Sequence, residues 1–185
     1  MTKAQLTVLA GPTAVGKGTV VAALTKRYST LKVSVSATTR DPRPGELNGV
    51  HYYFVSPQEF DAMIERGDML EWALVHGKNK YGTPRGPVDE ALNAGHPVLL
   101  EIDLAGARQV RANRPDAQFI FLAPPSWEEL ERRLIGRGTE GPEEQARRLA
   151  TARVELQAAS EFDHVVINDD VERAVDELAR LIGLE

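Results

Sequence analysis

A glycine-rich segment near the amino terminus has the residue types and spacing of a loop that binds phosphate groups. Residues 11–17 have the sequence Gly-Pro-Thr-Ala-Val-Gly-Lys. Glycines allow consecutive backbone N–H groups to turn toward phosphate oxygens, and the amino end of a following helix adds about half a positive charge. Lys17 is placed to reach the β- and γ-phosphates of a nucleotide. The segment therefore predicts a phosphate-binding loop (P-loop), although Gly18 and then Thr19 follow the lysine, where the usual pattern has Ser or Thr at once.

Two carboxylates stand at the end of a later apolar run, those of Glu101 and Asp103. Residues two apart in a strand point to the same face, so both side chains project near the carboxyl end of that strand. Ligands of open α/β sheets bind at this end, and such carboxylates can hold Mg²⁺ directly or through water. The alternative is that Asp103 caps the helix that begins at Leu104, and both roles are compatible.

A proline-stiffened loop carries two arginines three residues apart, Arg40 and Arg43. A stiff loop loses less conformational entropy when it clamps an anion, and Tyr52 and Tyr81 could add phenolic donors. The pattern indicates a second phosphate site, separate from the P-loop. Two such sites favour transfer of a phosphoryl group over simple hydrolysis. The alternative is a pair of surface arginines on a solvated loop.

Glu71 lies in an otherwise apolar strand beside Trp72 and needs a partner there. Guanine presents N1–H and N2–H₂ side by side, which two carboxylate oxygens can accept together. Ser36 or Thr83 could contact the O6 atom or the exocyclic amine. An exposed glutamate on an edge strand remains the alternative.

These side chains need elements that hold them in place. Short apolar runs predict buried strands at 5–10, 98–102, 119–122 and 165–167. Periodic patterns between them predict helices at 18–28, 84–94, 104–112, 126–136, 143–160 and 170–182. Strands that alternate with helices indicate an α/β fold, in which helices flank a P-loop core of parallel β-sheet.

Residues 33–83 interrupt that alternation. Strand-like segments at 33–39, 51–55 and 70–75 surround a helix that Ser56 opens. We expect one domain over residues 1–185, with a core of 1–32 and 84–185 and a small mixed-β insert at 33–83.

The composition of the 185 residues limits the classes of function. The chain has no cysteine, which excludes disulfides, thiol catalysis and cysteine-bound metals. A formal net charge of −5 argues against a general nucleic-acid coat but allows one local polyanion site. The apolar run before Gly11 is too short for a signal peptide or a membrane span, so we expect a cytoplasmic protein that binds neither nucleic acid nor membrane.

With these motifs in view, the chain resembles the guanylate kinase family, the nucleoside monophosphate kinases that act on GMP. The matching segments span nearly the whole chain, and 34–49 is more discriminating than the P-loop. They are 34–46, 48–49, 60–72, 81–83, 101–106, 124–126, 137–140, 147–149 and 167–169.

The resemblance implies a GMP site within the insert. Its residues would be Ser36, Glu71 and Thr83 at the guanine, Arg40, Arg43, Tyr52 and Tyr81 at the phosphate, and Glu101 and Asp103 beside them. The reaction it implies is direct in-line transfer from MgATP to GMP, with dGMP as a further expected acceptor and no protein nucleophile.

The resemblance also implies an ATP site and a helical lid at about 126–150. The ATP site would comprise Gly11, Pro12, Thr13, Ala14, Val15, Gly16, Lys17, Gly18, Thr19, Asn168 and Asp169. Asn168 would lie near the adenine, and Thr19 would reach Mg²⁺ through water. The catalytic set would be Lys17, Arg43, Arg137 and Arg148. For Arg147 and Arg148 the alternative is pairing with Glu143 and Glu144 along one helix.

Some positions depart from the family pattern, in which Ser-Gly usually stands at Thr13-Ala14, Asp is common at Glu101 and Gln is frequent at Ala105. None of these departures removes a charge that the transfer needs. Two other functions stay open at this point. One is a non-catalytic binding module of the same fold, which the intact Gly11, Gly16 and Lys17 disfavour. The other is a kinase for a different nucleoside monophosphate, which the role of Glu71 decides.

Overall fold

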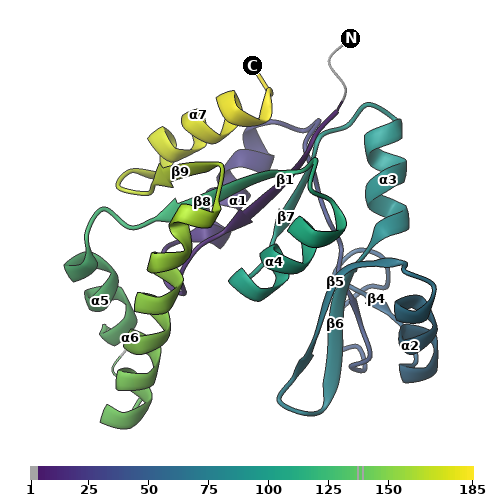
Figure 1. Ribbon diagram of the computed structural model, residues 1–185, viewed down its shortest axis with the longest axis horizontal. Helices are drawn as coiled ribbons and strands as arrows, with labels where there is room; N and C mark the ends of the chain where they lie inside the picture. Colours follow the sequence, from purple (N-terminus) through teal and green to yellow (C-terminus); the bar gives the residue numbers. More distant parts are fainter. Residues whose placement is uncertain (1–3, 137, 139) are drawn as a thin grey trace.

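A parallel sheet of five strands forms the centre of the computed structural model, which describes residues 4–136, 138 and 140–185. All pairs in this sheet are parallel, and the strand order is β2-β7-β1-β8-β9 (Figure 1). The strands are β2 (Lys32–Val33), β7 (Val98–Glu101), β1 (Leu6–Ala10), β8 (Gln118–Ala123) and β9 (His164–Ile167). The predicted parallel core is confirmed.

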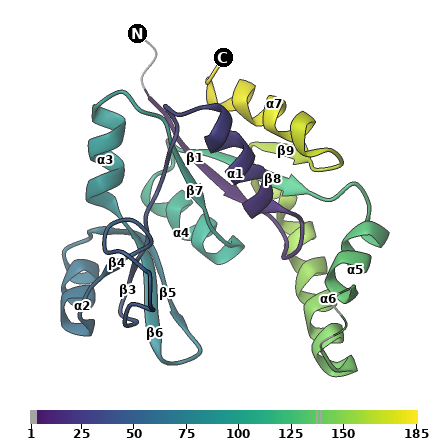
Figure 2. The same ribbon diagram turned by 180° about the vertical axis from the view of Figure 1, so that it is seen from behind.

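Helices cover both faces of this sheet. On one face, α1 (Lys17–Arg27) and α7 (Val171–Ile182) pack on Leu9, Leu99 and Ile120 (Figure 2). On the other face, α3 (Arg85–Asn93) and α4 (Leu104–Asn113) pack on Val8, Leu100 and Phe119. Each of these three residues is adjacent in its strand to one of the residues that face α1 and α7. Because successive strand residues point to opposite faces, an apolar run buried on both sides fills two cores. This explains why all five residues of β1 are buried.

A second sheet has four strands in the order β4-β3-β6-β5, of which only β3 and β4 run parallel. Its elements are β3 (Ala37–Thr38), β4 (Tyr53–Phe54), α2 (Pro57–Glu65), β5 (Met69–Val75) and β6 (Asn79–Pro84). The fully buried ring of Phe60 from α2 packs on Ala37 and Met69. The mixed character predicted for this segment is confirmed.

The strand-like segment 33–39 divides between the two sheets. Val33 pairs with Leu99 in the core sheet, whereas Ala37 pairs with Gly82 in the second. Ser34 still donates its backbone N–H to Leu99 at 3.0 Å, and Ser36 accepts from Tyr53 at 2.8 Å. The chain therefore crosses from one sheet to the other over three residues. The local residue pattern does not reveal this division, because tertiary packing determines which strand each part pairs with.

A hairpin of two helices projects from the side of the core sheet that lies away from the second sheet (Figures 1 and 2). Helix α5 covers Trp127–Ile135 and α6 covers Pro142–Gln157, and Leu130, Leu134 and Ala152 form the small core between them. The helix expected over 143–160 ends at Gln157 and continues as a 3₁₀ turn, η1 (Ala158–Glu161). We refer to α5 and α6 together as the lid hairpin.

Candidate active site

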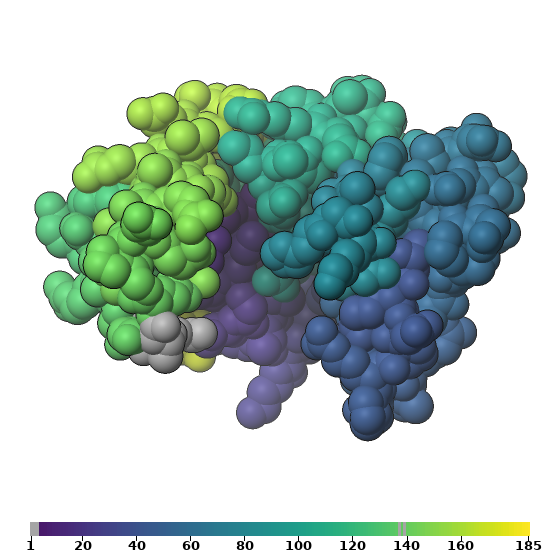
Figure 3. Space-filling model, turned by 90° about the horizontal axis from the view of Figure 1, so that it is seen from below, coloured from purple at the N-terminus to yellow at the C-terminus, as the bar shows by residue number. Residues whose placement is uncertain are grey.

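A broad groove separates the lid hairpin from the second sheet. Figure 3 shows it from below, with the green lid hairpin on one side, the blue second sheet on the other and the purple amino-terminal region at its floor. The P-loop lies at that floor, after the central strand β1, where the carboxyl ends of parallel strands form the usual ligand site of an open α/β sheet. Ligands on the two sides of the groove would therefore meet above the P-loop.

The P-loop backbone is turned so that the amino end of α1 is free of side-chain caps. Gly16 is the N-cap residue with φ of +96°, no side-chain cap hydrogen bond forms there, and the first turn holds no acidic residue. Ala14 also has a positive φ, +69°, and the N–H of Val15 donates to the carbonyl of Pro12 at 3.2 Å. This arrangement leaves the first N–H groups of α1 available to an anion.

Two glycines of this loop are required by close packing. A Cβ atom at Gly11 would lie 2.4 Å from the backbone oxygen of Leu122 in β8, a distance that real Cβ atoms do not adopt. A Cβ at Gly16 would lie 2.8 Å from Nδ2 of Asn168. The sequence motif thus holds the loop against β8 and β9 as well as turning its N–H groups.

Two side chains brace the P-loop from behind, and both bind the carbonyl of Val15. Nδ2 of Asn168 donates to it at 2.8 Å and a guanidinium nitrogen of Arg133 donates at 3.2 Å. Asn168 is only 4% exposed, so its amide is committed to the loop, whereas the neighbouring Asp169 is exposed and pairs with Arg173. Arg133 is not among the predicted site residues, because its spacing of four residues from Glu129 is typical of a surface ion pair along a helix, and the two side chains do pair at 3.3 Å.

The side chain of Lys17 extends to the segment that follows β7. Its Nζ donates to the carbonyl of Ile102 at 3.2 Å. Burial lowers the pKa of Lys17 from its ordinary value, and the carboxylates of Glu101, Glu155 and Asp103 act in the opposite direction. The ammonium group is therefore poorly hydrated and surrounded by negative charge, a setting in which a phosphate would be a strong partner.

The two carboxylates at the carboxyl end of β7, those of Glu101 and Asp103, have different surroundings. Oδ1 of Asp103 accepts the backbone N–H of Gly106 at 2.7 Å, so the predicted capping of α4 is confirmed. Glu101 is exposed, and its carboxylate lies 4.0 Å from the position of a Cβ at Gly18. Both carboxylates nevertheless act on Lys17, so the capping role and a place at the phosphate site are compatible.

On the other side of the groove, Arg40 is held by Glu46 through two hydrogen bonds of 2.8 and 3.0 Å. Glu46 also accepts the backbone N–H of Arg43 at 2.7 Å. The Arg40 side chain lowers the pKa of Glu46 to about 2, and Glu46 in turn raises the pKa of Arg40. Glu46 was part of the recognised motif but not of the predicted site, and the structure gives it the role of fixing the loop.

Three of the predicted phosphate ligands come together around this ion pair. The guanidinium of Arg40 lies 5.2 Å from the ring centre of Tyr52, which in turn lies 6.0 Å from the ring of Tyr81. The Arg40 side chain is only 14% exposed, so the alternative of a solvated surface arginine is wrong for this residue. Arg43 is exposed on the same loop.

Glu71 is buried although β5 is an edge strand. One of its carboxylate oxygens accepts the hydroxyl of Thr83 at 2.7 Å. Burial raises the pKa of Glu71, the Thr83 hydrogen bond opposes that shift, and the nearby Asp103 adds to it. The other oxygen lies 3.1 Å from the position of a Cβ at Gly106, so α4 covers it closely. The alternative of an exposed edge-strand glutamate is wrong, because α4 packs on this part of β5.

The remaining predicted guanine contact, Ser36, is half-buried where the chain crosses between the two sheets. Gln109 of α4 binds the backbone of β5, the edge strand that carries Glu71. Its side-chain amide accepts the N–H of Trp72 at 3.0 Å and donates to the Trp72 carbonyl at 2.9 Å. These two bonds fix β5, and with it Glu71, against the core.

In the lid hairpin, Arg148 pairs with Glu140 and, at 3.6 Å, with Glu144, while Arg147 pairs with Glu144 at 3.1 Å. The predicted pairing along one helix is present between Arg148 and Glu144, whereas Arg147 contacts Glu144 in place of the predicted Glu143. Arg148 also lines a pocket of about 430 Å³ together with Thr13, Ala14, Gly16, Arg133 and Leu134. Arg137, the other predicted lid arginine, lies outside the described residues.

The groove offers scattered oxygen donors for a divalent cation. Within residues 4–136, 138 and 140–185, no group of three or more His, Asp or Glu side chains is arranged to hold a metal ion. Thr19 lies exposed in the first turn of α1, and Glu101 and Asp103 lie near the P-loop lysine. These hard oxygen donors suit Mg²⁺, which keeps several waters and binds mainly through substrate phosphates.

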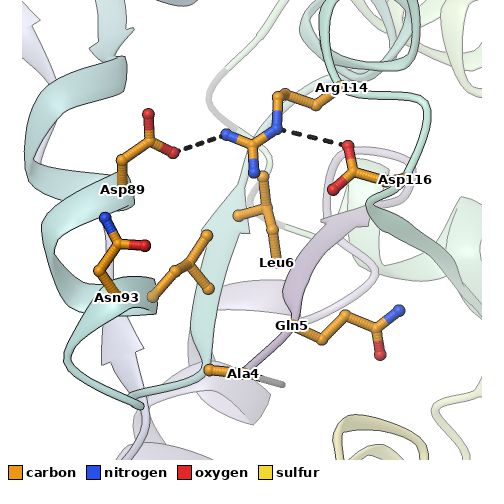
Figure 4. A pocket seen from close by; sticks show the side chains of 8 residues that line it. Ala4, Gln5, Leu6, Asp89, Asn93, Arg114 and Asp116 are labelled. Atoms are coloured by element: carbon orange, nitrogen blue, oxygen red, sulfur yellow. Dashed lines mark hydrogen bonds and ion pairs between the residues drawn. The ribbon is translucent and has the colours of Figure 1, made fainter.

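A different pocket, of about 360 Å³, lies at the amino end of β1, away from the P-loop. Figure 4 shows its lining side chains, among which Arg114 is already paired with Asp89 at 2.8 Å and with Asp116 at 3.4 Å. Ligands of parallel sheets bind at the opposite, carboxyl end of the strands. This pocket is therefore separate from the candidate site. Across the described part of the chain, no helix has both the length and the apolar content to cross a membrane.

Comparisons with known proteins agree with this geometry. A family model described as guanylate kinase matches residues 3–185. A guanylate kinase of Leifsonia xyli subsp. xyli is 61% identical over 96% of this chain and 70% of that protein, and one of Thermobifida fusca is 61% identical over 97% and 91%. The solved guanylate kinase of Anaplasma phagocytophilum is 31% identical, with a TM-score of 0.71 over 99% of this chain and 86% of that one.

Proposed function

Because this chain belongs to the guanylate kinase family, we propose that it is a phosphotransferase that moves the γ-phosphoryl group of ATP to GMP, giving ADP and GDP. One observation carries the assignment within the molecule. A P-loop with an uncapped helix terminus lies across one groove from a second site that combines a buried carboxylate, Glu71, with a held guanidinium, Arg40. A nucleotide donor and a purine monophosphate acceptor are the ligands that suit the two sides.

The donor side would hold the phosphates of ATP mainly through main-chain groups. The P-loop N–H groups and the amino end of α1 surround the β-phosphate, and Lys17 neutralises charge between the β- and γ-phosphates. Asn168 and Arg133 act from behind by fixing the Val15 carbonyl, and hence the orientation of the loop. In this proposal Asn168 supports the ATP site by holding the loop and also lies near the adenine.

Mg²⁺ would reach the site with the nucleotide, since its donors here are few and dispersed. Thr19 is the residue that would hold it through water, with Glu101 and Asp103 close enough to bind its water shell. When bound, the ion neutralises the phosphate charge that develops during transfer.

On the acceptor side, Arg40, Tyr52 and Tyr81 would bind the phosphate of GMP, and Arg43 would join them from the exposed part of the loop. Glu71 would accept both N1–H and N2–H₂ of guanine, with Thr83 and Ser36 at the neighbouring edge. Adenine has no donor at N1, so a carboxylate at this place favours guanine over adenine.

Transfer itself requires little covalent chemistry from the protein. The two substrates are brought in line, and cations stabilise the charge on the equatorial oxygens of a loose transition state. Lys17 and Arg43 would act from the two sides of the groove, while Arg137 and Arg148 would act from the lid. The lid, about 126–150, and the insert, 33–83, would close over the core formed by 1–32 and 84–185, which excludes water from the γ-phosphoryl group.

A steady-state assay tests this function. ADP release from MgATP is measured with GMP, dGMP, AMP, CMP and UMP as acceptors. We expect GMP to be the best acceptor, with dGMP also used. Preference for a non-guanine acceptor would make the chain a kinase for another monophosphate, and binding without turnover would make it a non-catalytic module.

A further inference from the structure

The lysine of the P-loop has one carboxylate neighbour that the proposed function leaves unexplained. Lys17 lies within electrostatic reach of Glu101, Asp103 and Glu155. Glu101 is the last residue of β7 and Asp103 follows that strand, so both belong to the floor of the groove. Glu155 instead belongs to α6, so the lid hairpin itself places a negative charge beside the site where ATP phosphates are expected to bind.

The position of Glu155 follows from how α6 lies against the P-loop. Glu144, Arg148 and Thr151 line one pocket of about 380 Å³ together with Thr13 of the loop. These helix residues are four and three positions apart, and Glu155 continues the same row four positions later. The row therefore faces the P-loop, and Glu155 is half-buried at its inner end.

Apolar contacts fix this part of α6 in place. Ala152 belongs to the small core of the lid hairpin, and Leu156 packs against that core from the next turn. The methyl group of Ala14, from the P-loop, packs against the same core. Glu155 lies between Ala152 and Leu156 in the sequence, so the helix segment that carries it is held close to the P-loop.

Two groups attract the Glu155 carboxylate and two effects oppose its charge. The ammonium group of Lys17 and the backbone N–H of Thr13 favour the charged form, whereas burial and the nearby Asp103 raise the pKa of Glu155. Arg148, two turns earlier on α6, is paired with Glu140 and Glu144, and Arg133 of α5 faces the Val15 carbonyl. Within the described residues, Lys17 is thus the cation that acts on Glu155.

We propose that Glu155 is a positioning residue that supplies a lid-borne counter-ion to Lys17 while the P-loop holds no nucleotide. When ATP phosphates bind, they replace Glu155 as the partner of Lys17 and repel its carboxylate. Phosphate binding is thereby opposed by a fixed negative charge, and the inner end of α6 is released from the P-loop. This inference rests on the proposed ATP site at the P-loop.

The substitution Glu155→Gln tests it with little change of shape. Glutamine keeps an oxygen that accepts from the Thr13 N–H but removes the charge. We expect the Kd of ATP to fall about tenfold and that of ADP to fall less, because ADP carries less charge. The KM for GMP should stay unchanged, since the acceptor binds across the groove, and kcat should fall as ADP leaves more slowly.

The matched control is Glu143→Gln, which removes the same charge from an exposed position on the same helix. It should leave the Kd of ATP at the wild-type value. The second variant, Glu155→Asp, retains the charge but retracts it, so its Kd should lie between those of the wild type and Glu155→Gln. Direct ATP binding by calorimetry is the readout, with thermal unfolding measured in parallel.

Equal ATP affinity in the wild type and Glu155→Gln, or an equal gain in Glu143→Gln, would overturn the inference. A change in the KM for GMP as large as that in ATP binding would do the same, because it would indicate a general structural effect. If Glu155→Gln does not fold, an ATP affinity of Glu155→Asp equal to that of the wild type overturns it. The proposed function fails by a different result, the absence of ADP release from wild-type protein with GMP.

Discussion

The two sides of the groove are built in different ways. The donor side uses backbone N–H groups on a loop that follows a fully buried strand and is braced by Asn168 and by the close approach of Gly11 to β8. The acceptor side uses side chains on strands of as few as two residues, held by local pairs such as Arg40 with Glu46. Recognition of the donor phosphates is thus part of the core packing, whereas recognition of the acceptor depends on individual side chains that single substitutions can alter.

The largest expected effect is on Lys17, the P-loop residue that acts through its side-chain charge. Replacing Lys17 by methionine should lower kcat by about 10² or more, because the charge between the phosphates is lost. The fold should survive, since burial already disfavours the ammonium group and methionine fills the same space. A coupled assay for ADP release and thermal unfolding together measure the two properties.

Lys26→Met on the exposed side of the same helix is the control, and its activity should match that of the wild type. Near-normal turnover of Lys17→Met would remove the lysine from the catalytic set. Loss of the fold in Lys17→Met would show that the charge of Lys17, in addition to the loop backbone, is needed for the stability of the donor side.

On the acceptor side, Glu71→Gln should alter specificity with little cost in stability. The oxygen of the glutamine amide can accept one guanine N–H, but its NH₂ group faces the second guanine donor without a hydrogen bond. We therefore expect kcat/KM for GMP to fall about 10- to 100-fold, while kcat/KM for AMP changes little. The KM for ATP should not change. Steady-state kinetics with both acceptors measures the ratio, and an unchanged preference for GMP over AMP would rule out contact between Glu71 and guanine.

The same variant has a stability effect whose sign follows from the raised pKa of Glu71. Above the ordinary pKa of 4.5, the folded protein binds more protons at this site than the unfolded chain, so the unfolding free energy falls as pH rises. Glutamine does not titrate. Glu71→Gln should therefore be at least as stable as the wild type at pH 7, with an advantage that shrinks as the pH falls through the raised pKa of Glu71 towards 4.5. Chemical denaturation at several pH values measures it.

The smallest effect is expected from Ala14→Gly in the P-loop. Glycine relieves the left-handed backbone strain of about 1–2 kcal/mol, but it costs about 0.4–1 kcal/mol of unfolded-chain entropy and loses a methyl contact with the lid hairpin. The change in unfolding free energy should be within about 1 kcal/mol. Gly16→Ala provides the contrast, because its Cβ would meet Asn168 at 2.8 Å. Equal stabilities of the two variants would contradict the packing account of the donor side.

Much of this arrangement could be predicted from local patterns. The predicted core strands and helices end within one or two residues of the observed elements, apart from the last turns of α6, because strand-length apolar runs and capping residues such as Ser126 and Asp103 mark their limits. The P-loop could be predicted from the spacing of its glycines and lysine and from its position between a strand and a helix. Residues that act through contacts distant in the chain could not be found in this way, and Arg133, Gln109 and Glu155 are examples.

Short-range patterns of residue types are enough to establish the alternation of strands and helices, the phosphate-binding loop and the arginine-bearing insert. Three features arise only in the folded chain: the burial of Glu71 against α4, the contact of Arg40 with Glu46 and the charge of a lid carboxylate near Lys17. The physical reason is the distance along the chain over which each effect acts. Backbone propensity and periodicity act over a few residues, whereas burial and charge at a site depend on elements that meet only when the chain has folded.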